Sequence, residues 1–559
     1  MTSKVVSARA VIERIRPRDT LCISGFVGTG TPEELIKALE SRFLHSNAPF
    51  DLTLVFAAAP GDGDSRGVNR LAHGGLLKRV IGGHWALVPK LGALALAGEM
   101  EAYNLPLGVM SQLYREIAGK RGGVLTKIGL GTFVDPRQDG GRLNKATWEE
   151  LVKVIVIDGE EWLLYKPFGI DVAFIRGTTA DRNGNISMEN EALTLDTLAI
   201  ATATKNSGGL VIAQVERVVA ANTLGSRDVE VPGILVDYIV EATAENHRQT
   251  WATQFDPAFA GQCRVNLGKA APMALDERKL VARRAACELP LGGIINLGIG
   301  MPEGVSRVAS EEGLLGAVTL TAEPGVIGGM PQGGLDFGAA VNNDALLAQN
   351  QQFDFYDGGG LDLAVLGMAQ VDARGNVNVS KFGSKLAGAG GFINISQSAS
   401  RLVFVGTFTT GGLEVAVDHG KLRIVSEGRT SKFLPAVEQI TFNGDIACRR
   451  GQAVLYVTER AVFQLTPRGL ELIEIAPGID LDTQILDLIP FPVIVRQPRP
   501  MNPCLYHPKA MGLAQLLGAN VVDGCVVAPE DELERRRDAR KRRRLSAGSH
   551  AEPVAAPGK

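Results

Sequence analysis

Short apolar runs alternate with helix-like stretches along most of the chain. Gly209–Val215, Leu363–Gly367 and Leu402–Gly406 are apolar at nearly every position. Such runs are typical of strands that are buried on both faces of a parallel or mixed sheet. Thr31–Glu34 and Pro302–Glu303 place a proline and acidic residues at a helix start, where both are favoured. The pattern predicts an α/β protein with mostly parallel sheets.

Three motifs recur in the same order in the two halves of the chain. The matched pairs are Gly28–Glu33 with Gly298–Glu303, Ala58–Gly61 with Ala322–Gly325, and Asp181–Ser187 with Asp372–Asn378. The 559 residues also exceed what one hydrophobic core usually supports. We therefore expect two tandem, diverged open α/β domains, residues 1–272 and 273–527, followed by an arginine-rich tail, residues 528–559.

The first and third motifs lie much farther apart in the first half than in the second. An insertion is therefore expected in the first half. Its place is the segment of residues 82–144, which we expect to be rich in loops and able to cover or shape a site.

Composition describes a globular protein with little bulk charge. Hydrophobic residues make up 45% and the formal net charge is -3, so overall charge does not indicate a nucleic-acid partner. Arg535–Arg537 and Arg540–Arg544 could bind nucleic acid or an acidic surface, but such a run is more often a solvated, disordered tail. The six cysteines form no close pair, which favours reduced cytosol over a disulfide framework or zinc site. The charged N-terminus and the absence of a long apolar window predict a cytoplasmic location without membrane insertion.

Glu323 ends an apolar stretch and is followed at once by a glycine-rich loop. An ionised carboxylate is expensive to bury without a partner, so a purely architectural repeat gives no reason for one here. The matched position in the first half is Ala59. This asymmetry favours a catalytic role for Glu323, while a helix-cap neighbour and a buried ion pair remain open alternatives.

The glycine motifs do not match the common nucleotide sites. Glu33 and Glu303 stand where a dinucleotide fingerprint needs its third glycine, and no phosphate-binding loop or zinc helix is present. The histidines are scattered, so we expect no metal and interpret His84 and His419 as satisfied structural groups. Gly388–Phe392, by contrast, offers backbone amides without side chains in the way, as binding of an anionic oxygen requires.

Together these motifs resemble family I coenzyme A transferases, and within them the fused-chain acetate or propionate CoA-transferases. The segments that carry the resemblance are Leu21–Pro32, Asn296–Pro302, Thr321–Gly334, Tyr103–Pro106 and Thr132–Arg137. Ser24 replaces the usual first glycine. Ala322 and Pro324 stand where the heterodimeric members have serine and asparagine, which indicates the short-chain acyl subgroup. The resemblance extends over about residues 5–525.

The resemblance implies transfer of coenzyme A between a short-chain acyl-CoA and a free carboxylate by a ping-pong mechanism. Glu323 would be the nucleophile and would form a glutamyl-CoA thioester. Coenzyme A is then a substrate, no cofactor is needed, and a homodimer or homotetramer is expected. The candidates for oxyanion and CoA binding are Gly298, Ile299, Gly300, Met301, Gly388, Gly390 and Gly391. The candidates for the substrate pocket are Gly28, Gly30 and Gln332.

Two other functions remain possible. An acyl-CoA hydrolase could use the same scaffold if water reached the enzyme thioester. A non-catalytic ligand-sensing or regulatory protein is the alternative from another class, because related folds serve such roles. The presence of Glu323 argues against the second alternative.

Overall fold

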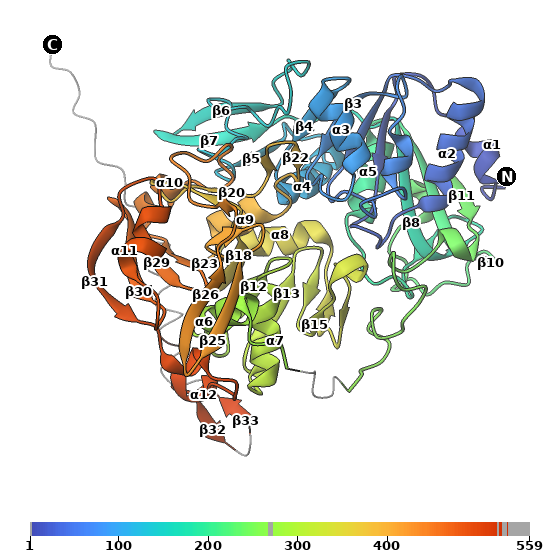
Figure 1. Ribbon diagram of the computed structural model, residues 1–559. Coiled ribbons are helices and arrows are strands. Elements are labelled where there is room, and N and C mark those ends of the chain that lie inside the picture. The colour runs from blue at the N-terminus through green and yellow to red at the C-terminus, as the bar shows by residue number, and fades with distance from the viewer. Residues whose placement is uncertain (1–2, 267–271, 523–524, 528–533, 535–559) are drawn as a thin grey trace, which may run out of the picture.

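The first half of the chain folds around one parallel sheet (Figure 1). The computed structural model describes residues 3–266, 272–522, 525–527 and 534. The strand order is β11-β10-β8-β1-β2-β3-β4, every pairing along it is parallel, and the short β9 pairs antiparallel with β8. The strands are β1 (Thr20–Ile23), β2 (Leu52–Phe56), β3 (Leu77–Gly82), β4 (Glu101–Asn104), β8 (Val172–Asp181), β9 (Ile186–Ser187), β10 (Leu210–Val219) and β11 (Tyr238–Glu241).

The second half repeats this plan and adds strands at both edges, all of them paired antiparallel except β31, which pairs parallel with β30. Its order is β17-β14-β13-β12-β18-β23-β28-β29-β30-β31, in which β13 through β28 are parallel. The parallel strands are β12 (Ile294–Leu297), β13 (Thr319–Ala322), β18 (Leu363–Gly367), β23 (Arg401–Val405) and β28 (Ala453–Val457). The edge strands are β14 (Val326–Ile327), β17 (Ala345–Leu346), β29 (Ala461–Thr466), β30 (Gly469–Ile475) and β31 (Ile494–Pro500).

The internal repeat extends to individual hydrogen bonds. Asp181 accepts the amides of Asn183 and Asn185 at 2.9 and 3.0 Å. Asp372, in the matched motif, accepts those of Arg374 and Asn376 at 3.0 and 3.1 Å. The same aspartate-centred turn thus forms in both halves, as its short acceptor side chain allows. The predicted fold class, two tandem α/β units with mostly parallel sheets, is confirmed.

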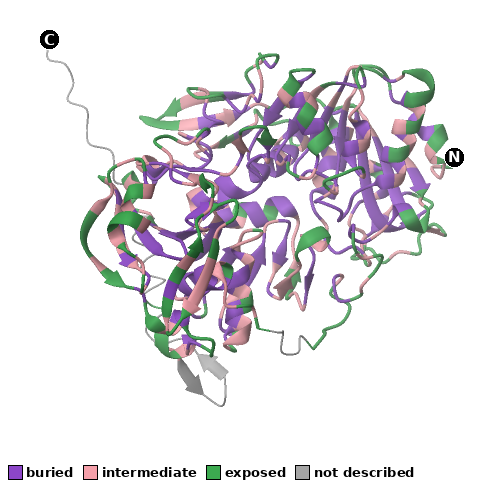
Figure 2. Cartoon of the chain, in the orientation of Figure 1, coloured by how far each residue is buried: buried purple, intermediate pink, exposed green. Residues whose placement is uncertain are grey.

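The segment of residues 82–144 combines regular elements with loops: it holds α3 (Pro89–Ala97), β4, α4 (Leu107–Ala118) and β5 (Val124–Thr126), and residues 127–144 form turns and bends. Strand β5 pairs into a separate sheet with β7 (Glu160–Tyr165) and β6 (Val152–Ile157), which follow the segment. Figure 2 shows much of the β6–β7 hairpin as exposed, whereas α4 is largely buried. Apolar residues recur at helical spacing in α4 and account for its burial. Glycines nearby in the sequence made this helical pattern less evident.

Helix α4 joins the two halves. It packs on α8 (Gln349–Asp357) and α9 (Phe392–Ser398) of the second half, and buried residues of all three helices belong to one hydrophobic cluster. Gly108 lies directly against the ring of Phe353, where an added Cβ would come within 2.3 Å of Cδ1. The two halves are therefore packed directly against each other through these helices.

The other elements lie around these sheets. The helices are α1 (Ala8–Ile12), α2 (Glu33–Ser46), α5 (Thr197–Asn206), α6 (Glu277–Ala286), α7 (Glu303–Glu311), α10 (Gly444–Arg449), α11 (Leu481–Gln484) and α12 (Leu513–Leu516). The two-stranded hairpins are β15 (Met330–Pro331) with β16 (Ala340–Val341), β19 (Gln370–Val371) with β20 (Val377–Asn378), β21 (Lys381–Phe382) with β22 (Lys385–Leu386), β24 (Thr409–Thr410) with β27 (Thr430–Ser431), β25 (Glu414–Asp418) with β26 (Lys421–Ser426), and β32 (Asn520–Val522) with β33 (Cys525–Val527). Nearly all of the arginine-rich tail lies outside the described residues. Residues 267–271, beside the expected domain boundary, also lie outside them.

Candidate active site

Glu323 directly follows β13, at the carboxyl edge of the second sheet. Ligands of open α/β sheets bind at this edge. The side chain is half-buried and has no ion pair with a described lysine, arginine or histidine. Burial raises the pKa of Glu323 to about 7, and only a hydrogen bond from the Gly391 amide opposes that shift. The carboxyl group is thus enclosed but poorly compensated.

The matched edge of the first sheet carries no acid. Strand β2 ends at Phe56, so Ala57 directly follows it, and Ala59 lies three residues past the strand end. The motif match of Ala59 with Glu323 is therefore offset by two positions relative to the strand ends. Both candidate positions in the first half, Ala57 and Ala59, are alanine. The first half therefore has no acid that corresponds to Glu323.

Gly391 meets Glu323 across the loop that precedes α9. A Cβ at Gly391 would lie 1.8 Å from Oε2 of Glu323 and 3.2 Å from the ring of Phe353. The φ angle of Gly391 is −78°, which any residue adopts. Space for the carboxylate, and not backbone conformation, therefore requires glycine here.

Three buried polar residues lie beneath the acid and were not found from the sequence. The Tyr356 hydroxyl donates to Thr321 Oγ1 at 2.8 Å, and Asn296 Nδ2 donates to the Thr321 carbonyl at 3.2 Å. Burial raises the pKa of Tyr356, and the charge of Glu323 contributes to the shift. Asn296 is the single polar residue of β12, whose other residues are apolar. That interruption was a usable signal in the sequence.

Gln352 lies beside the Tyr356 hydroxyl. It is fully buried one helical turn before Tyr356, and its side chain acts to lower the pKa of Tyr356 against the effect of burial. Neither its amide nitrogen nor its amide oxygen forms a hydrogen bond of normal geometry with a described residue. Buried amides are usually paired, so Gln352 is set apart from the surrounding network.

Two other buried carboxyl groups have raised pKa values but a different environment. Burial raises the pKa of Asp196 to about 7 and that of Asp357 to about 6. Asp196 accepts hydrogen bonds from Ser111 and Gln349, and Asp357 accepts from two side-chain amides. Both lie in the packed contact between the halves. Glu323 alone of the three has only a backbone amide as its partner.

Gly388 and Gly390 lie in the same loop as Gly391, but their amides are already bonded. Gly388 donates to the Ser380 carbonyl at 2.9 Å, and Gly390 donates to the Gly83 carbonyl at 2.8 Å. Both have positive φ angles, 75° and 53°, which glycine adopts without strain. These two residues shape the loop, while the Gly391 amide faces the carboxylate.

The turn of residues 298–301 lies before α7. Gly298 donates to the Val365 carbonyl at 2.9 Å, and Gly300 donates to Glu303 Oε1 at 2.9 Å. The amides of Ile299 and Met301 have no acceptor among the described residues, and the Ile299 side chain is 52% exposed. These two amides are free to meet a ligand.

Gly28 and Gly30, expected in the substrate pocket, lie in packed contacts of the first half. A Cβ at Gly28 would come within 2.4 Å of the Trp251 nitrogen, and one at Gly30 within 2.7 Å of Leu195. Gln332 belongs to the loop after Glu323, where its amide donates to the Met330 carbonyl at 3.0 Å.

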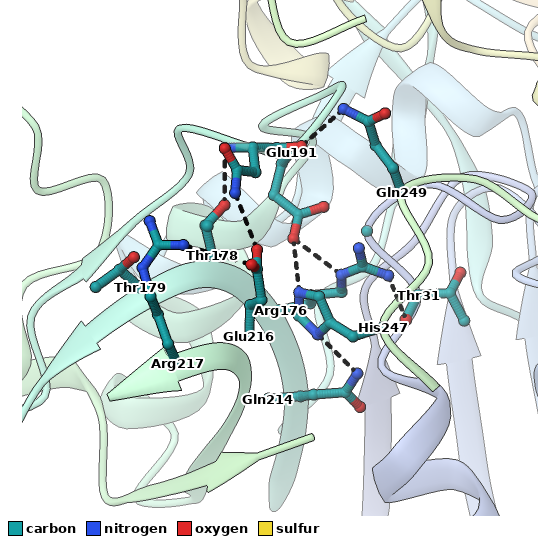
Figure 3. A network of polar contacts seen from close by, with 12 residues as sticks. Thr31, Arg176, Thr178, Thr179, Glu191, Gln214, Glu216, Arg217, His247 and Gln249 are labelled. Atoms are coloured by element: carbon teal, nitrogen blue, oxygen red, sulfur yellow. Dashed lines mark hydrogen bonds and ion pairs between the residues drawn. The ribbon is translucent and has the colours of Figure 1, made fainter. Parts of the chain in front are cut away.

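A second buried carboxylate, Glu191, lies against Arg176, midway along β8 and just beyond the end of the neighbouring β1 (Figure 3). Glu191 accepts from Arg176 Nε at 2.9 Å, and His247 Nε2 lies 3.4 Å away. Gln214 contacts the other ring nitrogen of His247 at 3.2 Å, and Arg176 also donates to the Thr31 carbonyl. Burial alone would raise the pKa of Glu191, but Arg176 and His247 lower it to about 2. This network fixes the turn before α2.

No group of three or more metal-ligating side chains occurs within the described part of the chain. None of the described helices is long and apolar enough to cross a membrane. Cys22, Cys263, Cys287, Cys448 and Cys504 are free thiols.

Comparison with known proteins places these observations in a family. A sequence model described as coenzyme A transferase matches residues 5–242. The chain is 46% identical to a caffeate CoA-transferase of Acetobacterium woodii over 523 residues, 92% of this chain and 100% of that protein. It is 43% identical to the acetate CoA-transferase YdiF of Escherichia coli (strain K12), over 91% of this chain and 96% of that one. A crystal structure of YdiF from E. coli O157:H7, as a thioester complex with CoA, superimposes with a TM-score of 0.86 at 41% identity, covering 91% of this chain and 97% of that chain.

Proposed function

The chain belongs to the coenzyme A transferase family, and on that premise we propose that Glu323 is the nucleophile of CoA transfer between an acyl-CoA and a free carboxylate. The observation that carries the proposal is the enclosed Glu323 carboxyl group in contact with Gly391 and without a described cationic partner. A carboxylate held by an arginine would be stabilised in its resting state and would attack less readily. Glu323 has no such partner.

The proposed reaction conserves the thioester at each step. A Glu323 oxygen attacks the acyl carbonyl carbon, and the C–S bond breaks to give a mixed anhydride and CoA thiolate. The thiolate attacks the Glu323 carbonyl carbon and expels the first carboxylate, which leaves a glutamyl-CoA thioester. A second carboxylate reverses these steps and leaves as the new acyl-CoA. No water, nucleotide or proton enters the net reaction.

The Glu323 carboxyl group must be ionised to attack. With its pKa raised to about 7 by burial, the group ionises around neutral pH. A carboxylate surrounded by several amides would have a much lower pKa and would be a weaker nucleophile. At Glu323 a single amide, that of Gly391, opposes the effect of burial. The raised pKa therefore increases reactivity while the group still ionises near neutral pH.

The glycine-rich segments receive separate roles in the proposal. The Gly391 amide is the oxyanion donor nearest Glu323, and one aimed donor is typically worth ~3 kcal/mol of barrier. Ile299 and Met301 supply free amides for the acyl or CoA oxygens. Gly298, Gly300, Gly388 and Gly390 carry no side chain, so CoA can approach the backbone closely there. Gly28, Gly30 and Gln332 stay predictions for the substrate pocket.

The acyl substrate is proposed to be short-chain, as acetate is for YdiF by name. The caffeate enzyme is similarly related to this chain, so an aromatic carboxylate is the sharpest competitor. Exchange from acetyl-CoA to a panel of acetate, propionate, butyrate and caffeate distinguishes them. Release of free CoA without exchange would instead identify a hydrolase.

Several coarser properties are proposed with the function. We place the domain boundary at residues 272/273, the second domain at residues 273–527 and the tail at residues 528–559. Coenzyme A serves as a substrate with no added cofactor, the protein acts as a homodimer or homotetramer, and it acts in the cytoplasm. Each of these follows from the family and the sequence pattern alone.

Trapping the intermediate tests the assignment of Glu323. Protein incubated with acetyl-CoA is digested, and the peptide that contains Glu323 is searched for the mass of CoA by mass spectrometry. We expect the adduct on Glu323 and its loss on addition of acetate. An adduct on any serine or cysteine instead would refute the proposal.

A further inference from the structure

A loop of the first half reaches the glycine loop beside Glu323. The Trp85 amide donates to the Ala387 carbonyl at 2.8 Å, and the Gly390 amide donates to the Gly83 carbonyl at 2.8 Å. A Cβ at Gly83 would come within 2.3 Å of the Ala57 carbonyl, at the position that directly follows β2. The first half thus fills its own strand end with a loop that crosses to the second half.

Asn104 fixes both loops at once. It is fully buried, and its amide nitrogen donates to the carbonyls of Gly82 and Gly83 at 3.1 and 2.8 Å. Its amide oxygen accepts the Ala389 amide at 2.8 Å. All of its hydrogen bonds hold the backbones together, so the crossing is rigid. The β22 hairpin of the second half accordingly packs on α3 of the first, and the two are drawn next to each other in Figure 1.

His84 is carried by this loop. A Cβ at Gly390 would lie 3.3 Å from the His84 Cδ2 atom, so the imidazole lies over Gly390. Gly390 is next in sequence to Gly391, which contacts the Glu323 carboxylate. Consecutive Cα atoms are only ~3.8 Å apart. The imidazole and the nucleophile therefore contact neighbouring residues of one loop.

The imidazole has no other task in the structure. The residue is half-buried, and neither ring nitrogen has a hydrogen-bond or ion-pair partner among the described residues. The expectation that His84 is a satisfied structural group is therefore wrong, since its fixed backbone leaves the side chain unpaired. His419, by contrast, is 94% exposed and lies 3.5 Å from Asp418. Burial lowers the pKa of His84 to about 4, so the ring is neutral at neutral pH and carries one N–H donor.

The glycine loop is short of donors. The amides of Gly388, Ala389 and Gly390 all bond within the protein, which leaves the Gly391 amide, already facing Glu323. Each tetrahedral adduct places a full negative charge on the former carbonyl oxygen. Such charges are usually stabilised by at least one preorganised donor.

We propose that His84 is a catalytic residue that donates a hydrogen bond to the acyl oxygen in the tetrahedral adducts at Glu323. When the Glu323 oxygen forms its bond to the acyl carbon, the C=O π pair moves onto oxygen, and the His84 N–H hydrogen bonds to that oxyanion. The C=O bond then re-forms as the C–S pair leaves with CoA. His84 keeps its proton throughout. This inference rests on the proposed role of Glu323.

The experiment compares His84→Ala, His84→Asn and His84→Gln with the control His419→Ala. Single-turnover formation of the Glu323 thioester is followed by quenching and mass spectrometry, while acyl-CoA affinity and Tm are measured alongside. His84→Ala is expected to slow thioester formation about 10²-fold, with acyl-CoA affinity and Tm close to those of the unsubstituted protein. Asparagine and glutamine place an amide N–H near the Nδ1 and Nε2 positions respectively. One of these two variants is expected to form the thioester about tenfold faster than His84→Ala. Which of the two does so identifies the ring nitrogen that donates.

The inference requires both the loss and the recovery. It is overturned if His84→Ala stays within about threefold of His419→Ala, or if neither amide variant recovers activity. A loss of affinity or Tm in step with the rate would also overturn it, because it would show a structural role. Failure of the Glu323 proposal looks different: the unsubstituted protein would then form no thioester on Glu323 at all.

Discussion

Glu191 and Glu323 are both enclosed carboxyl groups at the carboxyl edge of a parallel sheet, one in each half of the repeat. Arg176 and His247 surround Glu191, and its pKa is lowered to about 2. Glu323 has one backbone amide and no cation as partners among the residues that the structure describes, and its pKa is raised to about 7. The same edge thus holds a stabilised charge in the first half and a destabilised one in the second.

The presence or absence of a compensating cation distinguishes a structural carboxylate from a reactive one better than the degree of burial does. A compensated carboxylate supports the fold, because its charge stabilises the native state relative to the unfolded chain. An uncompensated carboxylate weakens the fold and is retained where a reactive group is needed. Substitutions at the two glutamates should therefore have opposite consequences for stability and for activity.

The largest expected effect is on activity at Glu323. Glu323→Ala removes the nucleophile and should lower acyl exchange by about 10⁴-fold or more, since loss of a covalent nucleophile has effects of this order. Exchange between acetyl-CoA and labelled acetate measures it. The far-UV circular dichroism spectrum should stay that of the unsubstituted protein. If Glu323→Ala retained a tenth of the normal exchange rate, Glu323 would not be the nucleophile.

Glu191→Gln should chiefly affect stability. It leaves Arg176 buried beside a neutral amide, and breaking a buried pair in this way costs about 3–5 kcal/mol. Because the folded pKa of Glu191 is depressed, its contribution is present above the ordinary glutamate pKa of ~4.3 and is lost as pH falls toward 2. Urea unfolding at pH 7 and pH 3.5 measures the effect, which should shrink at the lower pH. The folded fraction should still form the Glu323 thioester; a variant of full stability that has lost the thioester would reverse the comparison.

Gly391→Ala tests the space around the reactive carboxylate. The added methyl group would meet Oε2 at 1.8 Å, so Glu323 must move away from its amide donor, and activity should fall about 10²–10³-fold. The φ angle suits alanine, so Tm should change little. Gly316→Ala is the matched control, because nothing lies within 4 Å of its Cβ position. If Gly391→Ala were as active as Gly316→Ala, the Glu323 carboxylate would not need the space that glycine leaves at position 391.

The smallest expected effect is a gain in stability on Glu323→Gln. A raised folded pKa means that the carboxyl group stabilises the fold when protonated and opposes it as pH rises through about 7. The amide removes this opposition, so the variant should be more stable at pH 8 by about 1–2 kcal/mol, a figure reduced for the partial exposure of the site. Thermal unfolding at pH 5 and pH 8 checks it. A variant that gains as much at pH 5 as at pH 8 would show that charge is not the cause.

Much of the architecture followed from local pattern. The apolar runs specified β10, β18 and β23, because a strand buried on both faces has little choice of residue. The paired aspartate turns at Asp181 and Asp372 predicted the repeat. The helical character of residues 107–118 was missed, because glycines nearby suggested loops although apolar residues recur at helical spacing.

The sequence by itself determined the two α/β units, the family resemblance and the choice of Glu323, because strand burial, turn chemistry and a lone acid after a strand are local properties. Only the tertiary structure decided which groups surround that acid. Asn104 and His84 lie in the first half of the chain, yet they meet residues 387–391 of the second through contacts that no local pattern encodes. Whether a buried carboxylate is compensated depends on such long-range neighbours, so Glu191 and Glu323 differ in their surroundings and not in their residue type.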